Sequence, residues 1–166
     1  MKDNCYKLLQ SIGQLQPPQR QLESGEGKVY PHYDASENDY PDDLVFATSL
    51  NEIKEEKDLE SQKRYGEIKV RRKYLWVIND GQLLMAWEGT VADNPRGFVC
   101  HTNITGGKDA IIGGELWFLS SGDGEFDIYL NFDSGRYKTV DADTQHPLAY
   151  ELFECVGYRK INPLIL

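Results

Sequence analysis

The sequence has no long hydrophobic run and few cysteines, and each absence excludes a class of protein. No apolar stretch approaches the ~20 residues of a membrane-spanning helix, and the opening segment MKDNCYKLLQ lacks the apolar core of a secretory signal. The three cysteines include no C-x-x-C pair, which argues against zinc or redox chemistry. We therefore predict a soluble, cytoplasmic protein with reduced, mostly buried thiols. Export by a machine that needs no signal stays open.

Basic residues are also scarce. Lys and Arg number 18 against 27 Asp and Glu, so the formal net charge is −9. This charge repels nucleic-acid phosphates and favours basic partners, so we predict no non-specific nucleic-acid binding. The lack of a long apolar run predicts no membrane partner. Ten acids and two bases lie within residues 34–60. That segment is either a solvated helix face or a docking surface for a basic protein.

Standard motifs are absent as well. The chain shows no internal repeat and no nucleotide-binding, metalloprotease, EF-hand or hydrolase signature. No pair of its three histidines has metal-ligand spacing, so we predict no metal site. The sequence names no cofactor and leaves open whether the protein is an enzyme.

The length of 166 residues suits one domain, and we predict a single domain over residues 1–166. Residues 1–65 form a helical, acidic N-terminal part with a long loop, and residues 66–166 form a β-rich core with a C-terminal helix. In the first part, apolar spacing predicts a helix over 3–16. A capping-box pattern predicts a second helix from 50 to about 64.

The β-rich core is predicted to be an antiparallel sheet of about five strands. Asp80 and Gly81 mark a hairpin turn between the first two strands, and GFVCHT, GELWFL and EFDIYLNF follow as the other three. A helix is expected from about Pro147 to Val156 with Pro147 in its first turn, and the tail INPLIL should cover a sheet edge or an opening of the core. The predicted fold class is α+β, with helices from both ends of the chain flanking the sheet.

Two small-residue motifs carry the candidate chemistry. In HTNITGG, at the end of the third predicted strand, glycine backbone and hydroxyl groups can cradle an anion or a polar ligand. In FDSGRY, a turn presents an arginine fork and a tyrosine hydroxyl. If the sheet places the two strand ends side by side, they form one pocket. Its predicted catalytic residues are His101 and Tyr137, and its predicted ligand-binding residues are Thr102, Asn103, Gly106, Gly107, Ser134 and Arg136.

Each motif also has a structural explanation. His101 can be a core histidine bonded to a backbone carbonyl, and the glycines can serve turns or bulges. Arg136 can pair with Asp133 or Asp127 at the surface. His146, at the expected start of the last helix, suits capping better than chemistry.

The motifs resemble a domain of plant IQ-motif-containing calmodulin-binding proteins and of assorted bacterial and fungal proteins. The resemblance covers about residues 74–137. The family's His-Ser-Ser segment, Gly-Gly pair, Gly-Glu step and Ser-Gly-His-Tyr segment are matched by His101, Gly106, Gly107, Gly114, Glu115, Ser134, Gly135 and Tyr137. Thr102, Asn103, Gly113 and Arg136 depart from it. The resemblance implies that the two motifs belong to one site, but no IQ segment is visible and the calmodulin role does not carry over.

Three functions follow as hypotheses. The first is a ligand-binding or group-transfer domain for a nucleotide-like or phosphorylated small molecule, in which His101 would serve as acid or base and Arg136 would stabilise negative charge. A histidine, a tyrosine and a downstream glutamate such as Glu151 or Glu154 are also similar to ADP-ribosyltransferase pockets that bind NAD. The second is an acidic immunity or antitoxin-type protein that neutralises a basic toxin. The third is an accessory domain without a site.

Overall fold

The structure is a computed structural model that describes residues 3–19, 45–46, 62–64, 67–69, 74–87, 99–120 and 126–163. Its helices are α1 (Asp3–Ser11), α3 (His101–Thr105) and α4 (Ala142–Cys155). Its strands are β1 (Val45–Phe46), β2 (Gln62–Arg64), β3 (Glu67–Lys69), β4 (Tyr74–Ile78), β5 (Leu83–Trp87), β6 (Ile112–Ser120), β7 (Phe126–Leu130) and β8 (Arg159–Pro163).

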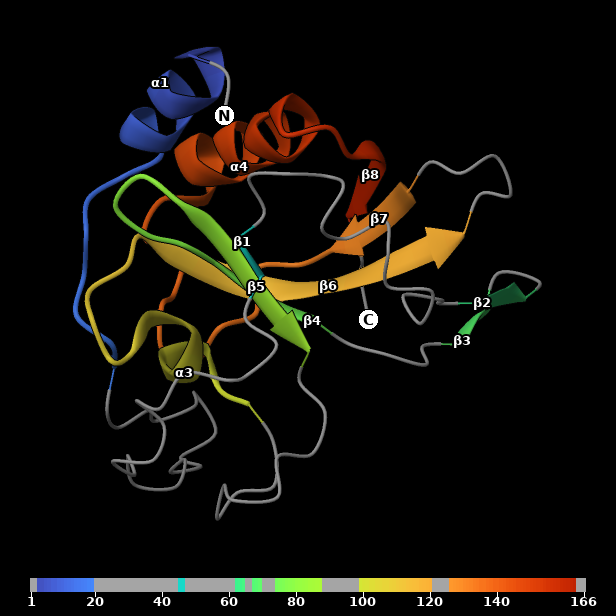
Figure 1. Ribbon diagram of the computed structural model, residues 1–166, viewed down its shortest axis with the longest axis horizontal. Helices are drawn as coiled ribbons and strands as arrows, with labels where there is room; N and C mark the ends of the chain where they lie inside the picture. Colours follow the sequence, from blue (N-terminus) through green and yellow to red (C-terminus); the bar gives the residue numbers. More distant parts are fainter. Residues whose placement is uncertain are drawn as a thin grey trace.

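Six of these strands form one sheet in the order β1-β5-β4-β6-β7-β8, and β2 pairs with β3 separately. All neighbours in the large sheet are antiparallel except β7 and β8, which run parallel. Helices α1 and α4 lie on one face of this sheet and the short helix α3 lies on the other (Figure 1). The α+β class is therefore confirmed, whereas the predicted five-stranded arrangement matches only in part.

The predicted hairpin is the part that matches best. Strands β4 and β5 pair along their whole length, and the turn between them closes with a bond of 3.0 Å from Asn79 N to Gln82 O. Gly81 adopts a φ of 87°, which glycine reaches without strain. The local turn signal at Asp80 and Gly81 was enough to place both strands.

The third predicted strand, GFVCHT, is wrong at its last two residues, which begin helix α3, and its first two residues lie outside the described ranges. Cys100 is extended, and its backbone N–H donates to Asn103 Oδ1 at 2.8 Å, which turns the chain into a helix. Gly106 ends the helix in the left-handed conformation with a φ of 64°. The apolar composition of the segment reflects burial rather than strand pairing.

Three predicted helix boundaries also need correction. Helix α1 ends at Ser11 rather than near residue 16, because Gln16 pairs with Ala110 in an isolated antiparallel bridge. Helix α4 begins at Ala142, so Pro147 lies inside it rather than in its first turn. The predicted helix over 50–64 is wrong at its end, where β2 forms, and its remainder lies outside the described residues. Most of the predicted loop before residue 43 lies outside them too.

The predicted position of the tail is confirmed for the residues that form β8, which pairs with the sheet edge at β7. Strand β1, from the predicted N-terminal part, pairs with β5 of the predicted core. The single-domain organisation nevertheless stays a prediction. None of the helices in the described ranges is long and apolar enough to cross a bilayer.

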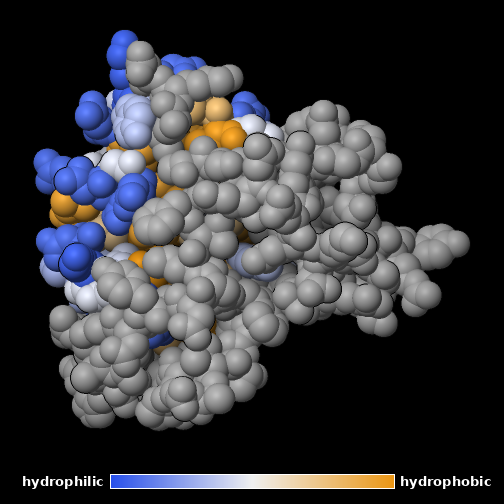
Figure 2. Space-filling view, in the orientation of Figure 1, coloured by the Kyte–Doolittle hydropathy of each residue, from blue (hydrophilic) through white to orange (hydrophobic). Residues whose placement is uncertain are grey.

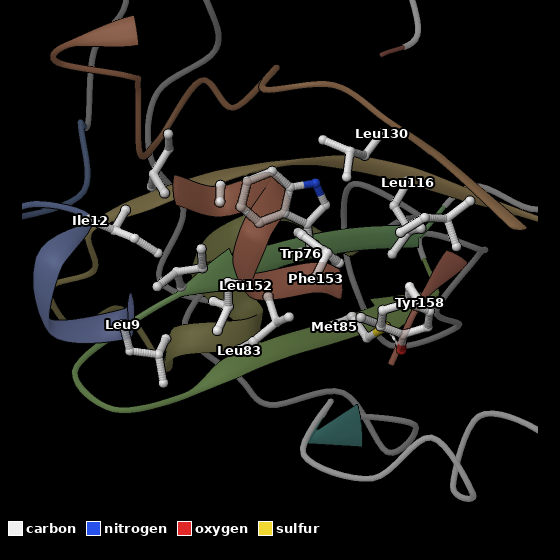
Figure 3. Close-up of a cluster of buried hydrophobic side chains, with 14 of the residues drawn as sticks. Leu9, Ile12, Trp76, Leu83, Met85, Leu116, Leu130, Leu152, Phe153 and Tyr158 are labelled. Carbon is white, nitrogen blue, oxygen red and sulfur yellow. Dashed lines mark hydrogen bonds between the residues drawn. The ribbon is translucent and has the colours of Figure 1, made fainter. Parts of the chain in front are cut away.

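The main apolar cluster lies between the sheet and helices α1 and α4 (Figure 3). Trp76 of β4 is fully buried in it and makes edge-to-face contacts with Phe132 and Phe153, at centroid distances of 5.5 and 5.3 Å. Leu9 and Ile12 contribute to the cluster from the N-terminal end of the chain. Burial of these side chains supplies most of the stability of this face.

A disulfide joins Cys5 of α1 to Cys155 of α4, with 5.7 Å between their Cα atoms. The prediction of reduced thiols is therefore wrong for two of the three cysteines, whereas Cys100 is buried and forms no disulfide. The two bonded cysteines are 150 residues apart in the sequence. Only the packing of α1 on α4 brings them together, so no local spacing could reveal the pair.

Candidate functional site

The two predicted motifs meet at Gly113 of β6. A side chain built on Gly113 would place its Cβ 3.0 Å from His101 Cδ2 and 3.2 Å from Ser134 Oγ. Thus α3 and the turn after β7 each bring a polar side chain to the place where Gly113 has none. We call these three residues the glycine junction. His101 and Ser134 leave too little space for a side chain on residue 113, which explains why β6 needs glycine there.

His101 is held in the glycine junction by a hydrogen bond of 2.8 Å between its Nε2 atom and the backbone oxygen of Gly114. Because a carbonyl oxygen can only accept, Nε2 carries the hydrogen. In the neutral ring, Nδ1 is then the acceptor. This is the carbonyl-bonded histidine that the sequence left open as the structural explanation, although 8% of its surface stays exposed.

Tyr137 lies deeper, and its hydroxyl group is engaged within the protein. The hydroxyl donates to Lys108 O at 2.6 Å, and Thr105 Oγ1 lies 2.7 Å away on its other side. Since the single hydrogen of Tyr137 goes to the carbonyl, Thr105 is the donor to the tyrosine oxygen. This chain of bonds ties the FDSGRY turn to the end of α3. A catalytic role for Tyr137 stays a prediction.

The remaining residues of HTNITGG shape helix α3. Thr102 is fully buried, and its carbonyl oxygen accepts from Gly107 N at 2.9 Å. The side chain of Asn103 accepts the hydrogen bond from the backbone N–H of Cys100, the N-terminal cap residue of α3. Gly106 and Gly107 have φ values of 64° and 76°, so both need the left-handed conformation that favours glycine. A ligand can reach the two glycines, which are half-buried, more easily than it can reach Thr102.

Ser134 and Arg136 lie in the turn after β7 and are nearly buried, with 7% of each exposed. Ser134 Oγ accepts from Tyr137 N at 3.0 Å, which closes the turn. Arg136 Nη1 donates to Gln19 O at 2.6 Å. This bond ties Arg136 to the backbone at Gln19, and its pairing with Asp133 or Asp127 stays a prediction.

The charge around the glycine junction differs from that of the whole chain. Lys108 follows the first motif and Lys138 follows the second, and both are exposed. Together with Arg136 they make three bases against three nearby acids, Asp109, Glu115 and Asp133. In a chain of net charge −9, a small anion meets less repulsion in this balanced neighbourhood than the net charge of the chain alone would give.

Sequence reasoning missed one polar pair beside the glycine junction. Asn131 Oδ1 accepts from Glu115 N at 2.9 Å, and Asn131 Nδ2 donates to Glu115 Oε1 at 3.1 Å. A side chain built on Gly114 would collide with Asn131 O, so the second glycine of the pair is also required. The Gly-Gly-Glu sequence in β6 was the signal, but its partner Asn131 could not be read without the pairing of β6 and β7.

Other predicted functional groups lie elsewhere. Glu151 and Glu154 are exposed on α4, which covers the opposite face of the sheet from α3 (Figure 1). His146 of α4 stacks on Phe132, with 3.6 Å between ring centroids, and its Nε2 is 2.9 Å from Thr139 Oγ1. Burial lowers the pKa of His146, and Asp143 opposes that shift. The structure therefore places the two glutamates on the other face of the sheet from α3, whereas His146 contacts Phe132, the first residue of FDSGRY.

The geometry of the glycine junction suits binding better than nucleophilic catalysis. The His101 atom that approaches Gly113 opposite Ser134 is Cδ2, a carbon, and His101 Nε2 is used by a carbonyl. Over the ranges that the structure describes, no three His, Cys, Asp or Glu residues are grouped to hold a metal ion. The arrangement can offer hydroxyl, imidazole and guanidinium groups to a polar ligand.

The chain matches no known protein-family model, no curated protein and no solved structure. The resemblance to the IQ-motif-containing proteins therefore stays a prediction. The geometry gives the matched positions a physical explanation of their own, because each one supports α3, the glycine junction or the turn that closes on Tyr137.

Proposed function

We propose that the protein binds a small anionic ligand, such as a nucleotide or a sugar phosphate, at the glycine junction. The observation that carries the proposal is the approach of His101 and Ser134 to the same point above Gly113, from motifs more than 30 residues apart in the numbering. Partial exposure supports it, because His101, Ser134 and Arg136 keep 7–8% of their surface accessible while Thr102 and Tyr137 keep none. Ligand contacts are thus assigned to the first three residues.

Charge supports an anionic ligand over a neutral one. The guanidinium group of Arg136 lies two residues from Ser134, and the exposed lysines at 108 and 138 flank the two motifs. Guanidinium and backbone N–H groups are the donors that proteins use most often for phosphate. A group-transfer step is left out of the proposal, because Tyr137 is fully engaged within the protein.

The test is a titration followed by NMR of the histidine side chains, of which the chain has three. Inorganic phosphate, AMP, ATP and ribose 5-phosphate are added separately to ¹⁵N-labelled protein. At least one is expected to shift the His101 ring signals and leave those of His146 unchanged. Before any addition, the His101 signals should show a hydrogen on Nε2.

Variants then locate the contact. Ser134→Ala and Arg136→Lys are expected to weaken the binding of the active ligand at least tenfold, while His146→Gln on the other face leaves binding unchanged. If none of the four probes shifts His101, or if both site variants bind as tightly as the wild type, the proposal is wrong.

A second candidate is an acidic protein that binds a basic partner, and one feature of α4 favours it. Asp143, Glu151 and Glu154 are exposed on this helix, which contains no lysine or arginine. Two of these acids lie near the helix C-terminus, where the helix dipole disfavours negative charge and a cationic partner would relieve the repulsion. The most direct test is to purify any basic protein encoded beside this chain and to measure association rates at low and high salt. Steered docking requires the rate to fall steeply as salt rises.

A further inference from the structure

The segment after α1, residues 13–19, runs from the helix-covered face of the sheet to the glycine junction, and we call it the N-terminal strap. In Figure 1 it is the blue chain that descends from α1 toward α3. Figure 2 shows mainly hydrophilic side chains on this side of the molecule, with smaller hydrophobic areas between them. Leu15 of the strap is itself 45% exposed. Most of the strap is exposed or half-buried and Pro18 is buried, so specific bonds supply much of what holds it in place.

Gln16 makes the first set of these bonds. Its backbone exchanges hydrogen bonds of 2.8 and 3.0 Å with Ala110. Its side-chain Nε2 donates to Ile111 O at 2.9 Å and to Lys138 O at 2.8 Å. Ala110 and Ile111 directly precede β6, and Lys138 directly follows the FDSGRY turn. One glutamine thus ties together the two chain segments that form the glycine junction.

Gln19 makes the second set, and its partner belongs to the proposed ligand site. Gln19 N donates to Arg136 O at 2.9 Å, and Arg136 Nη1 donates to Gln19 O at 2.6 Å. The position of the Arg136 guanidinium group therefore depends on the strap. A change that displaces the strap would therefore also remove the bonds that position Arg136.

The other end of the strap is anchored covalently. Helix α1 has nine residues, too few for a helix that is stable without tertiary contacts. It is held on α4 by the buried side chains of Cys5, Leu9 and Ile12 and by the disulfide from Cys5 to Cys155. Terminal units of this kind open locally at a lower free energy than central strands do. The disulfide is the one covalent constraint on this unit among the described residues.

We propose that the Cys5–Cys155 disulfide is a redox-controlled latch on the N-terminal strap. A dithiol reductant opens the latch by thiol–disulfide exchange. One reductant thiolate attacks the sulfur of Cys155, which belongs to a half-buried residue whereas Cys5 is buried, the bond to Cys5 breaks, and the second reductant thiol resolves the mixed disulfide. Two protein thiols and one oxidised reductant result, so two electrons and two protons pass to the protein.

The latch also bears on the compartment in which the protein works. Disulfides persist in oxidising compartments and are rare in the cytosol. The oxidised form, with the strap in place, is therefore expected outside a reducing cytosol. The strap is expected to be released in reducing surroundings. A cytoplasmic location stays a prediction, and the latch does not support it.

The experiment is residue-resolved amide exchange by NMR on the full chain, with and without dithiothreitol and without any ligand. Two neighbouring amides form a matched pair. Ala110 N donates to Gln16 O in the strap, whereas Ile111 N donates at 2.8 Å to Ile78 O at the end of β4. Reduction is expected to speed exchange more than tenfold at Ala110 and Gln19 and to leave Ile111 within twofold.

Two variants complete the test. The double variant Cys5→Ser with Cys155→Ser should show fast exchange at Ala110 without reductant and no response to it, and Cys100→Ser should respond as the wild type does. Equal acceleration at Ala110 and Ile111, or no change at either, overturns the latch, and so does ready alkylation of Cys5 and Cys155 in the oxidised folded protein. Because no ligand is present, failure of the latch leaves the phosphate titration of the oxidised protein as a separate test of the proposed function.

Discussion

The two faces of the large sheet are stabilised in different ways. The face under α1 and α4 carries a cluster of aromatic and aliphatic side chains around Trp76. The face under α3 carries a smaller apolar cluster, which includes Val77, Ile104 and Tyr137. Around it lie buried polar residues: His101, Thr102, Asn103, Thr105 and Ser134. The first face depends mainly on buried apolar area, and the second depends on hydrogen bonds whose partners come from distant parts of the chain.

This difference indicates which face of the sheet is better suited to a binding site. Apolar packing is non-directional and tolerates the exchange of one hydrophobic side chain for another of similar volume. A buried polar network instead requires each donor and acceptor to have its partner. Among the described residues, the α3 face therefore holds the larger group of buried polar side chains, including His101 and Ser134, in fixed orientations, which a binding site needs.

The largest expected effect breaks the apolar face. Trp76→Ala removes a fully buried indole with two edge-to-face partners, so the free energy of unfolding should fall by about 3–5 kcal/mol. Val77→Ala, the next residue on the same strand, removes about two methylene equivalents from the α3 face and should cost about 2 kcal/mol. Urea unfolding with the disulfide intact measures both. Equal losses in the two variants would contradict the contrast between the faces.

A smaller effect is expected on the polar face. Tyr137→Phe keeps the ring but removes the hydroxyl that donates to Lys108 O and one of the partners of Thr105 Oγ1, so it should cost about 1–3 kcal/mol. Tyr6→Phe, at a residue that is 45% exposed, is the matched control and should stay within about 0.5 kcal/mol of the wild type. Thermal or urea unfolding compares them. A Tyr137→Phe variant as stable as the control, yet unable to bind the ligand, would restore a direct role for this hydroxyl group.

The smallest effect concerns His146, which stacks on the apolar face. Burial lowers the pKa of His146 below its ordinary value of 6.5, and the Asp143 carboxylate only partly opposes this. The unfolded chain therefore binds the proton more readily, so stability is complete above pH 6.5 and falls as the pH drops from 6.5 to the folded pKa.

The measurement is the melting temperature of wild type and His146→Gln between pH 7.5 and 5.0. The wild type should lose slightly more than the variant below pH 6.5. A variant that loses as much as the wild type would show that His146 does not contribute.

Local signals placed the parts of the fold that are local in sequence. The Asp80-Gly81 pair located the β4–β5 hairpin because the turn needs only adjacent residues. Helix α3 was missed because its segment is apolar enough for a strand, and the decisive bond, from Cys100 N to Asn103, involves a side chain. The disulfide was missed because its partners meet only through the packing of α1 on α4.

The candidate site was predictable to a similar extent. The sequence motifs placed His101 and Ser134 at chain positions that the sheet brings to one glycine. The motifs could not show which residues are accessible to a ligand and which are enclosed by the fold. Ser134 and Tyr137, for example, differ in burial and in hydrogen bonding, and neither property can be read from the sequence. The strap residues Gln16 and Gln19 carry no motif, so their bonds to both halves of the site were outside the reach of sequence patterns.

The bond between Cys5 and Cys155 also determines how this chain can be moved through a narrow passage. With the bond intact, the residues between the two sulfurs form a covalently closed loop. When an unfolding or transport machine threads the chain up to the crosslink, more than one strand must enter the pore side by side. A channel wide enough for a single extended chain would stall there. Passage in single file therefore requires that the bond be absent before translocation and form only afterwards.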